Sequence, residues 1–318
     1  MHRNRHSGLI FPAFLVSVLS TLVAVWPKEG LSQEPSVRLR VASYNLWGLP
    51  GLLLQKPKRM PLLVRELPKS GADVLILNEA FSAKTRPIAM LKEYPYRAFG
   101  PGKSGLNISS GVVLLSKYPI LKADLLKFSN CAGMDCFSNK GAVHVQVSVP
   151  GVGPVDVLGT HLSSDGRDSL RSSQIRQVLS MLPSGETTGP ILLAGDLNFH
   201  SESIPYSELV SEAGFRDSHA EYRAFHPGLS NVEWFGFSYD PSRNSNIAWL
   251  RPTSRSERLD YIWVKDGNCV RVDVHASGLL LDQKVEGLHL SDHFGVMTDL
   301  DFYREVSGSC PDSLASSI

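Results

Sequence analysis

The sequence predicts an α/β protein built from two packed β-sheets with flanking helices. Segments of strand length alternate apolar and polar residues, short continuous apolar runs stand between them, and two longer segments repeat apolar residues at helical spacing. Strands mixed with a few helices are typical of sheets that pack on each other and are covered by helices. The 318 residues contain no long low-complexity linker, so a single domain over residues 33–318 is expected.

Each expected element follows from its own pattern. Alternation with a period of two predicts strands over residues 37–45, 142–149 and 155–162. Continuous apolar runs predict strands over residues 73–80, 111–116 and 191–194. Apolar residues on one helical face predict two helices, residues 59–71 with Leu62, Leu63 and Leu67, and residues 169–182 with Leu170, Ile175, Val178, Leu179 and Leu182.

Residues 1–32 have the composition of a secretory signal peptide. Two arginines precede an apolar run over residues 9–26, and a small, polar segment follows it. Cleavage would leave a mature chain that begins near Gln33. The alternative is an uncleaved anchor, because the run approaches the roughly 18 residues that span a bilayer. The protein is therefore expected to be secreted or periplasmic, or membrane-anchored if the segment is retained.

Four cysteines are expected to form two disulfides, because an exported protein folds in an oxidising compartment. Cys131 and Cys136 lie close together in a loop-like stretch and are expected to close a small ring. Cys269 and Cys310 then pair by elimination, although four cysteines allow three connectivities. The cysteines lack the spacing of a structural zinc site.

The charge balance offers no sequence-wide attraction for nucleic acid. The chain has 32 basic and 31 acidic residues, which gives a net charge of +1. A local basic patch stays open as an alternative.

Polar residues stand at the exits of the expected strands. These residues are Asn45, Asn78, Glu79, His161, Asp196 and Asn198, with Asp292 and His293 just before a final strand. α/β folds place their chemistry at the carboxyl ends of strands. Five such exits that converge on one rim would form a site.

The residue types at these exits suit a hard metal ion. The oxygen ligands offered are Glu79, Asn45, Asp196, Asn198 and Asp292. Sets made only of oxygen ligands bind Mg²⁺, Ca²⁺ or Mn²⁺. With His161 and His293 beside the ion, one imidazole can take a proton from water while another donor stabilises the departing oxygen, as phosphate ester hydrolysis requires.

Taken singly, these residues have simpler explanations. Asp196 and Asn198 are typical of a turn in which side chains bind the local backbone. A lone histidine such as His161 is more often structural than catalytic, and Glu79 could cap a helix. Only their joint occurrence favours a site.

Seven motifs occur in an order that is known from other proteins. SYN, LNEAF, GTHL, RSSQ, GDLN, LDYI and SDHFGV fall within residues 37–302, and in this the chain resembles the endonuclease/exonuclease/phosphatase superfamily, which has the deoxyribonuclease I-like fold. It is most similar there to bacterial secreted neutral sphingomyelinases, which are phospholipase C-type enzymes. CAGMDCFSNKGAVHV (131–145) and FSYDPSRNSNIAW (237–249) carry this narrower match.

The resemblance implies a four-layered α/β sandwich of two mixed β-sheets packed face to face. It also implies a Mg²⁺-dependent phosphodiesterase, with Mn²⁺ or Co²⁺ as substitute ions, that converts sphingomyelin to ceramide and phosphocholine. The partner would then be a sphingolipid or another phospholipid at a membrane surface, and the enzyme would act as a monomer.

The same motifs imply a metal end of the site. Glu79 would bind the ion, with Asn45 and Asp292 in support. Lys140 is a solvated loop cation if judged by residue type alone. Its place in the matching SNKG stretch instead implies a role near the substrate phosphate.

The catalytic end follows by motif as well. His293 would be the general base that activates water, oriented by Asp260. Asp196 and Asn198 would position the attacking water and a phosphoryl oxygen of the substrate. His161 would stabilise the developing charge or help to protonate the leaving alkoxide.

One expected feature of these sphingomyelinases is missing. They carry an aromatic-rich hairpin near the C-terminus that enters the bilayer, whereas here the region has only Leu279–Leu281. The leucines either insert weakly or form a strand. Trp234, Phe235 and Phe237 are other apolar candidates, although aromatic residues in such a run usually belong to a core.

Two other functions are open. An extracellular nuclease, or a phosphatase acting on inositol phosphates or another phospholipid, would keep the chemistry and change the substrate. A nuclease needs basic residues near the site, and PKRMP (57–61) and RPTSRSER (251–258) offer some. The second alternative is a binding module on an inactive scaffold. Loss of a catalytic or metal-binding residue would favour it, but the chain has all four of the residues concerned, Glu79, His161, Asp196 and His293.

Overall fold

The computed structural model describes residues 35, 37–49, 57–183, 189–250, 253–304 and 310. These residues belong to one unit that spans Glu34–Ile318. The expected signal peptide, residues 1–32, lies outside them, so the division into a leader and one domain stays a prediction. No helix in this described part is long and apolar enough to cross a membrane.

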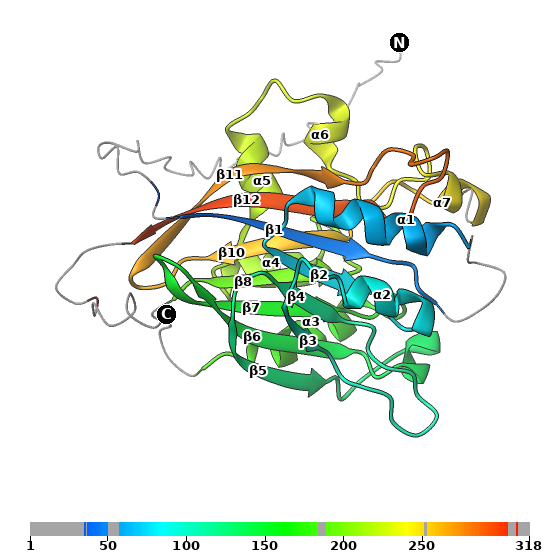
Figure 1. The fold of residues 1–318 in the computed structure, drawn as a ribbon, viewed down its shortest axis with the longest axis horizontal. Helices are drawn as coiled ribbons and strands as arrows, with labels where there is room; N and C mark the ends of the chain where they lie inside the picture. The colour runs from blue at the N-terminus through cyan, green and yellow to red at the C-terminus, as the bar shows by residue number, and fades with distance from the viewer. Residues whose placement is uncertain are drawn as a thin grey trace, which may run out of the picture. The chain divides into compact units, whose positions relative to one another are not determined.

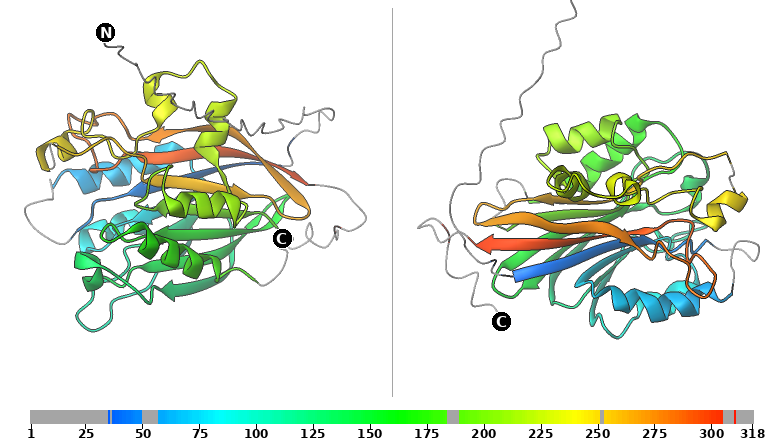
Figure 2. Two further views of the ribbon diagram at one scale, coloured as in Figure 1. Left: turned by 180° about the vertical axis from the view of Figure 1, so that it is seen from behind. Right: turned by 90° about the horizontal axis from the view of Figure 1, so that it is seen from above.

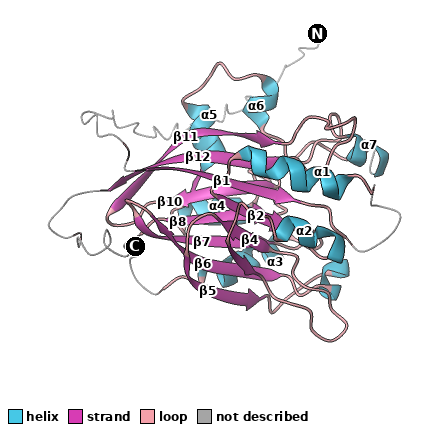
Figure 3. Cartoon of the chain, viewed as in Figure 1, coloured by secondary structure: helices cyan, strands magenta, loops and turns pink. Residues whose placement is uncertain are grey.

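Twelve strands of the described chain form two six-stranded sheets (Figures 1 and 3). Sheet one has the order β11 (Val270–Leu280), β12 (Gly295–Arg304), β1 (Val37–Asn45), β2 (Val74–Asn78), β4 (Val113–Ser116) and β3 (Tyr96–Phe99). Sheet two has the order β5 (Ile120–Lys127), β6 (Gly141–Val149), β7 (Gly153–His161), β8 (Ile191–Asp196), β10 (Asp260–Lys265) and β9 (Arg216–Asp217). Both sheets are mixed, because β1 with β2 and β7 with β8 are parallel and the other pairs are antiparallel.

Helices cover the outer face of each sheet (Figure 2, right). The α-helices are α1 (Arg59–Glu66), α2 (Arg86–Ala89), α3 (Asp168–Leu179), α4 (Ile204–Ser211), α5 (Ser218–Ala224), α6 (Asn231–Phe235) and α7 (Ser245–Leu250). Short 3₁₀ helices lie at η1 (Leu67–Ser70), η2 (Ala83–Thr85) and η3 (Gly133–Phe137). Residues of α1 and α2 share a buried cluster with sheet one, and residues of α3 and α4 share one with sheet two. The predicted four-layered sandwich of two mixed sheets is confirmed.

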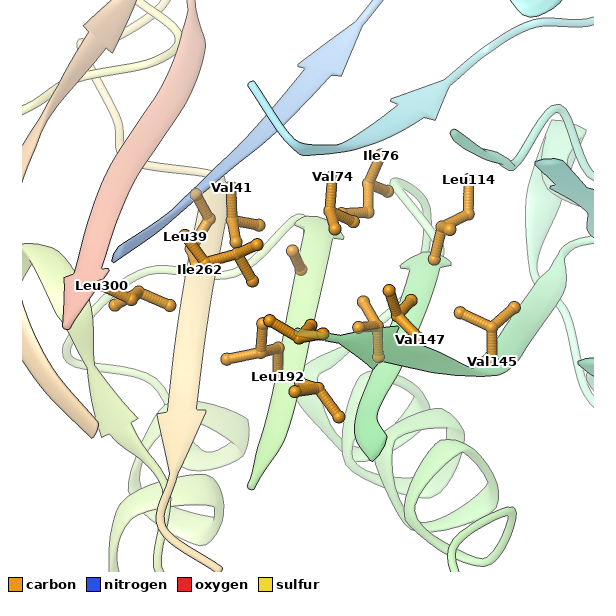
Figure 4. Close-up of a cluster of buried hydrophobic side chains, with 14 of the residues drawn as sticks. Leu39, Val41, Val74, Ile76, Leu114, Val145, Val147, Leu192, Ile262 and Leu300 are labelled. Atoms are coloured by element: carbon orange, nitrogen blue, oxygen red, sulfur yellow. The ribbon is translucent and has the colours of Figure 1, made fainter. Parts of the chain in front are cut away.

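The main core lies between the two sheets (Figure 4). Val74 and Ile76 of β2 point into it, while the alternate residues Leu75 and Leu77 pack against the helices outside. Since both faces of β2 are covered, this strand appears in the sequence as a continuous apolar run. Every residue of β2 is buried.

The two predicted helices form, with small changes at their ends. The helix expected over residues 169–182 is α3, and Ile175 and Val178 lie on its buried face. The helix expected over residues 59–71 is α1 followed by η1. Pro68 lacks the amide hydrogen that an α-helix needs at that position, so the α-helix ends before it.

The leucine triplet belongs to the sheet edge of the fold. Leu279 and Leu280 are strand residues of β11 and pair with Val296 and Gly295 of β12. Leu281 packs against the cluster under α1. Of the two interpretations of this triplet, the strand is the one observed.

Candidate active site

The strand exits converge because of how the strands pair. Asn45 lies opposite Asn78 where the parallel strands β1 and β2 end. In the other sheet, Asp196 lies opposite His161 at the end of β7 and opposite Asp260 at the start of β10. Parallel strands bring their carboxyl ends to one edge, and an antiparallel neighbour adds its first residue there. The predicted rim is therefore formed.

Two asparagines join the sheets at this rim. Asn45 donates from Nδ2 to Asp196 Oδ2 at 2.9 Å. Asn78 donates from Nδ2 to the Thr160 carbonyl at 2.9 Å and accepts from the Asp196 amide at 3.0 Å. Both side chains are buried. Sequence analysis placed Asn78 at a strand exit but gave it no role, because its partners come from the other sheet.

His293 and Asp260 form a buried pair. Nδ1 of His293 lies 2.7 Å from Oδ2 of Asp260, which leaves Nε2 directed toward Asp196 Oδ2 at 3.8 Å. Although burial opposes ionisation, the carboxylates of Asp260 and Asp196 hold the pKa of His293 well above its ordinary value. Burial raises the pKa of Asp260 to about 6, and the negative charge of Asp196 contributes to this rise. The geometry is that of an imidazole oriented by a carboxylate.

Glu79 follows β2 in a left-handed backbone conformation, with φ of 57°. Oε1 accepts from Asn45 Nδ2 at 3.2 Å, whereas Oε2 is enclosed and has no hydrogen-bond partner among the described residues. Burial and then the charge of Asp292 raise the pKa of Glu79 to about 7. A strained backbone that aims an unsatisfied carboxylate into the site is a feature of functional positions, and a cation would satisfy it.

The donor groups could hold a metal ion in two adjacent ways. Glu79 with Asn45 and Asp292 is the set that the motifs imply. Ligand atoms of Asp196, Asp260 and His293 also lie within 4.8 Å of one another. In the second set, however, His293 Nδ1 and Asp260 Oδ2 already bind each other. The unpaired oxygen of Glu79 makes the first set the better fit for a hard cation.

His161 also lies near Asp196 Oδ2 but has a different second neighbour, Lys140. Its Nε2 lies 3.5 Å from Asp196 Oδ2 and 3.1 Å from Lys140 Nζ. Burial, followed by the lysine charge, lowers the pKa of His161 to about 3. At neutral pH this imidazole is therefore uncharged.

Lys140 is buried, so the interpretation as a solvated loop cation was wrong. Its ammonium group donates to the Leu162 carbonyl at 2.7 Å and pairs with Asp135 at 3.0 Å. The charge can be buried because both partners compensate it. Asp135 also accepts from the Ser164 amide at 2.7 Å. Asp135 was not predicted, because its role depends on contacts between its loop and the segment that follows β7.

Asn198 combines both interpretations of its motif. Its amide donates to Asp196 Oδ1 at 3.1 Å, as in an Asx turn, and its φ is 51°. The side chain donates to the Leu162 carbonyl at 3.1 Å. The turn thereby holds Asn198 in the rim beside His161.

Ser291 fixes the segment that carries Asp292 and His293. Its hydroxyl donates to the Asn45 carbonyl at 2.6 Å and accepts from the His293 amide at 3.2 Å. Asn244 and Asn246 both donate to the Ser291 carbonyl, at 3.0 and 2.8 Å. These three buried residues were not predicted, and their polar types inside the SDHFGV and RNSN stretches were the available signal.

Two arginines of the basic stretches, Arg59 and Arg258, are structural, whereas Arg255 is exposed. Arg59 is fully buried and donates to the carbonyls of Leu46 and Leu290 at 2.6 and 2.8 Å. Arg258 is buried against Asp217 in an ion pair. Neither guanidinium is available to a polyanion in solution.

Both predicted disulfides are confirmed, Cys131–Cys136 and Cys269–Cys310. The first closes the turn that contains Asp135, between Cys131 and Cys136. The second joins the start of β11 to the segment after β12. Disulfides persist in oxidising compartments.

Curated relatives with lipid-directed names resemble this chain. A phospholipase C of Staphylococcus aureus is 27% identical over 263 residues, which cover 73% of this chain and 75% of that protein. A sphingomyelinase C of Bacillus cereus is 28% identical over 263 residues and covers 73% of this chain and 76% of that protein.

Solved structures share the fold. A beta toxin variant of Staphylococcus aureus with bound magnesium ions matches with a TM-score of 0.62 at 22% identity, over 85% of this chain and 100% of that chain. TDP2 of D. rerio with a single-strand DNA product matches with a TM-score of 0.65 at 21% identity, over 83% and 99%. At these identities the likeness concerns the fold alone.

A family model decides the assignment. The model described as Endonuclease/Exonuclease/phosphatase family matches residues 42–293, which include every residue of the rim. The expectation of a phosphate ester hydrolase of this superfamily is thereby confirmed. The chain belongs to the Endonuclease/Exonuclease/phosphatase family.

Proposed function

We propose that this protein is a secreted, Mg²⁺-dependent phosphodiesterase that hydrolyses sphingomyelin to ceramide and phosphocholine. The observation that carries the chemistry is the position of Asp196 between two buried imidazoles, with the unsatisfied carboxylate of Glu79 beside it. The names of the relatives, phospholipase C and sphingomyelinase C, support the substrate.

Glu79, Asn45 and Asp292 would hold the ion in this proposal. Bound there, Mg²⁺ would neutralise negative charge on the phosphoryl oxygens. Mn²⁺ and Co²⁺ are the expected substitutes. The fit rests on Oε2 of Glu79, which has no partner among the described residues, and on the all-oxygen donor set.

His293 acts as the general base. Asp260 binds Nδ1 at 2.7 Å and so fixes the ring with Nε2 facing the site. Water gives a proton to Nε2 and attacks phosphorus, and the bond between phosphorus and the ceramide oxygen breaks. Asp196 and Asn198 position the water and a phosphoryl oxygen, which is consistent with the 3.8 Å between Nε2 and Asp196.

His161 and Lys140 act on the leaving group. Charge develops on the ceramide oxygen as its bond to phosphorus breaks, and a proton must reach it. Lys140 is a fixed cation at 3.1 Å from His161, so its ammonium group offers the positive charge and the proton, while the neutral His161 offers an N–H hydrogen bond. Phosphocholine and ceramide are then the products.

The nuclease alternative keeps this chemistry and changes the substrate. It is supported by a shared fold with a DNA-bound relative. It is weakened by the burial of Arg59 and Arg258, which leaves Lys58 and Arg255 as the exposed cations of the two basic stretches in the described part of the chain. A sphingolipid at a membrane surface is therefore the favoured partner, with the protein as a monomer.

Export is part of the proposal. It is supported by the composition of residues 1–32 and by the two disulfides.

The test is an assay on the purified chain from Gln33 onward. We expect it to release phosphocholine from sphingomyelin liposomes with Mg²⁺ and not with EDTA, and we expect no nicking of plasmid DNA. Nicking without lipid turnover would move the substrate to nucleic acid. Inactivity on both would point to another phosphate ester or to a binding module.

A further inference from the structure

Two loops beside the site expose large apolar side chains. Leu106 is 99% exposed, Met134 is 75% exposed and Phe137 is 62% exposed. Among the described large apolar residues, Leu106 and Met134 have the two highest exposed fractions. Apolar side chains held in water at this level, on neighbouring loops, mark an interaction surface.

Hydrogen bonds fasten the two loops to each other. Asn107 donates from Nδ2 to the Cys136 carbonyl at 3.0 Å, and the Ile108 amide donates to the Phe137 carbonyl at 3.0 Å. The Asn139 amide returns a bond to the Ile108 carbonyl at 2.9 Å. Leu106, Met134 and Phe137 are therefore held on one surface, which we call the loop rim.

The loop rim is attached directly to the proposed chemistry. Asp135 follows Met134 and pairs with Lys140 at 3.0 Å, and Lys140 lies 3.1 Å from His161. The Cys131–Cys136 disulfide closes the turn around Asp135. Figure 1 shows both loops at the end of the sheets where the arrow of β1 ends. The loop rim is therefore connected to His161 through the contacts of Asp135 with Lys140 and of Lys140 with His161.

The leucine triplet does not supply such a contact. Leu280 is only 7% exposed, and Leu279 pairs with Val296 inside the sheet. A lipid substrate whose headgroup must reach the rim needs an apolar contact elsewhere on that side. The loop rim offers it, with the exposed cation Lys103 on the Leu106 loop. A second exposed cation, Arg167, lies between β7 and α3, in the segment whose Asp165 accepts from the Met134 amide at 2.8 Å.

We propose that the loop rim, Leu106 with Met134 and Phe137, is the surface by which this enzyme docks on a lipid bilayer. The apolar side chains enter the acyl boundary, and Lys103 and Arg167 meet the lipid phosphates. The inference rests on the proposed lipid phosphodiesterase activity. It assigns the membrane contact to loops that also carry the Asp135 anchor of the site.

The test separates docking from turnover. The loop-rim variant is Leu106→Ser/Met134→Ser/Phe137→Ser. The control variant is Leu121→Ser/Leu125→Ser, which also replaces exposed apolar side chains by serine, on the edge strand β5. Docking is measured by co-sedimentation with sphingomyelin/phosphatidylcholine vesicles, in a His293→Ala background so that the vesicles stay intact. Turnover is measured with vesicles and with a short-chain sphingomyelin below its micellar concentration.

We expect the loop-rim variant to lose at least tenfold in vesicle partition and in vesicle hydrolysis. Its hydrolysis of the monomeric short-chain substrate should change less than twofold, and the β5 variant should behave as wild type throughout. Equal thermal unfolding of the three proteins checks that each is folded.

Two results would overturn the proposal. One is wild-type vesicle partition in the loop-rim variant. The other is a loss of partition that appears instead in Val232→Ser/Phe235→Ser, which removes two exposed apolar side chains of α6. The wild-type protein could also bind vesicles through the loop rim and yet hydrolyse neither vesicle nor short-chain sphingomyelin. That result would support the docking surface and contradict the proposed activity.

A single-residue measurement sharpens the result. Leu106→Trp places an indole at the most exposed of the described large apolar residues. Its emission should shift to shorter wavelength with vesicles and should be quenched by brominated lipid. An unchanged emission with vesicles that the protein demonstrably binds would exclude this loop from the contact.

Discussion

The two histidines of the site are both buried, but they differ in protonation. His293 is surrounded by Asp260 and Asp196, which raise its pKa well above the ordinary value against the effect of burial. His161 shares Asp196 but has Lys140 on its other side, and burial with this cation lowers its pKa to about 3. One carboxylate thus lies between a cationic and a neutral imidazole.

Two residues of the same type therefore have different catalytic roles because their charged neighbours differ. A histidine beside two carboxylates is a stronger base once its ring is deprotonated, and in that form it accepts a proton from water. A neutral histidine next to an ammonium group cannot hold a second positive charge, so it acts through its N–H and through the lysine. The residues around His293 and around His161 can be changed separately by mutation.

The largest effect is expected from removing the base. His293→Ala should lower kcat by about 10³-fold with an intact fold, because general base catalysis contributes on the order of 10² to 10⁴. The matched control is His144→Gln, since His144 is a second buried histidine bound to an aspartate, Asp156, at 2.7 Å outside the site. Comparable losses in both variants would mean that the effect is structural.

Next is the carboxylate that orients the base. Asp260→Asn should lower kcat about a hundredfold, because the amide can hold the imidazole in the wrong tautomer. The pH profile gives the sign. Asp260 raises the pKa of His293, and the base works when deprotonated, so its loss should move the rising limb of kcat to lower pH. The measurement is kcat against pH at saturating Mg²⁺, and a limb that does not move would contradict the assignment of His293.

The third prediction concerns the metal end. Glu79→Gln should weaken Mg²⁺ binding at least tenfold, measured by the Mg²⁺ dependence of activity and by calorimetry. In metal-free protein the same change should raise stability at pH 8 by up to about 3 kcal/mol, since the pKa of Glu79 is raised to about 7 and ionising it costs folding free energy.

The sign of this stability effect is set by linkage. The neutral carboxyl is favoured in the fold, so wild-type stability is lost as pH rises from the ordinary glutamate range through about 7. The gain from glutamine should therefore vanish at pH 5. Denaturant unfolding at both pH values checks it, and an equal or larger gain at pH 5 would rule out this cause.

The smallest effect is expected on the His161 side. Lys140→Met should raise the pKa of His161 toward its ordinary value, because the lysine charge is removed while the larger cause of the depression, burial, remains. We expect roughly a tenfold loss of kcat. Proton NMR titration of His161 reads the pKa, with Lys127→Met, a lysine of β5, as the control. A pKa that does not change would remove Lys140 from the account.

Much of the fold was predictable from local pattern. The alternation in β6 and the continuous run in β2 record which strand faces are covered, and the apolar stripe of α3 records its packing on sheet two. α5, α6 and β9 are short, and their residues follow no sustained period. They were not predicted because tertiary contacts, more than local propensity, stabilise elements of this length.

The site divides in the same way. Asn45, Glu79, His161, Asp196 and His293 could be named because each stands next to a strand whose end the sequence marks. Asn78 was named as a strand-exit residue without a role, and Asp135, Ser291 and Asn244 were not named, because their roles depend on contacts that form only in the folded chain. Lys140 was misjudged for the same reason, since its compensation by Asp135 and the Leu162 carbonyl exists only after folding.

Two packed sheets, two disulfides and a rim of hard oxygen ligands with two histidines could all be predicted from the sequence alone. Local patterns and residue types suffice for these, because they depend on the period of a strand and on ligand chemistry. Three properties depend on the folded structure. These are the protonation of each histidine, the burial of Lys140, Arg59 and Arg258, and the exposure of Leu106 on its loop. Those properties depend on which charges and surfaces meet in a low-dielectric interior, and residues from separate strands and loops determine that jointly.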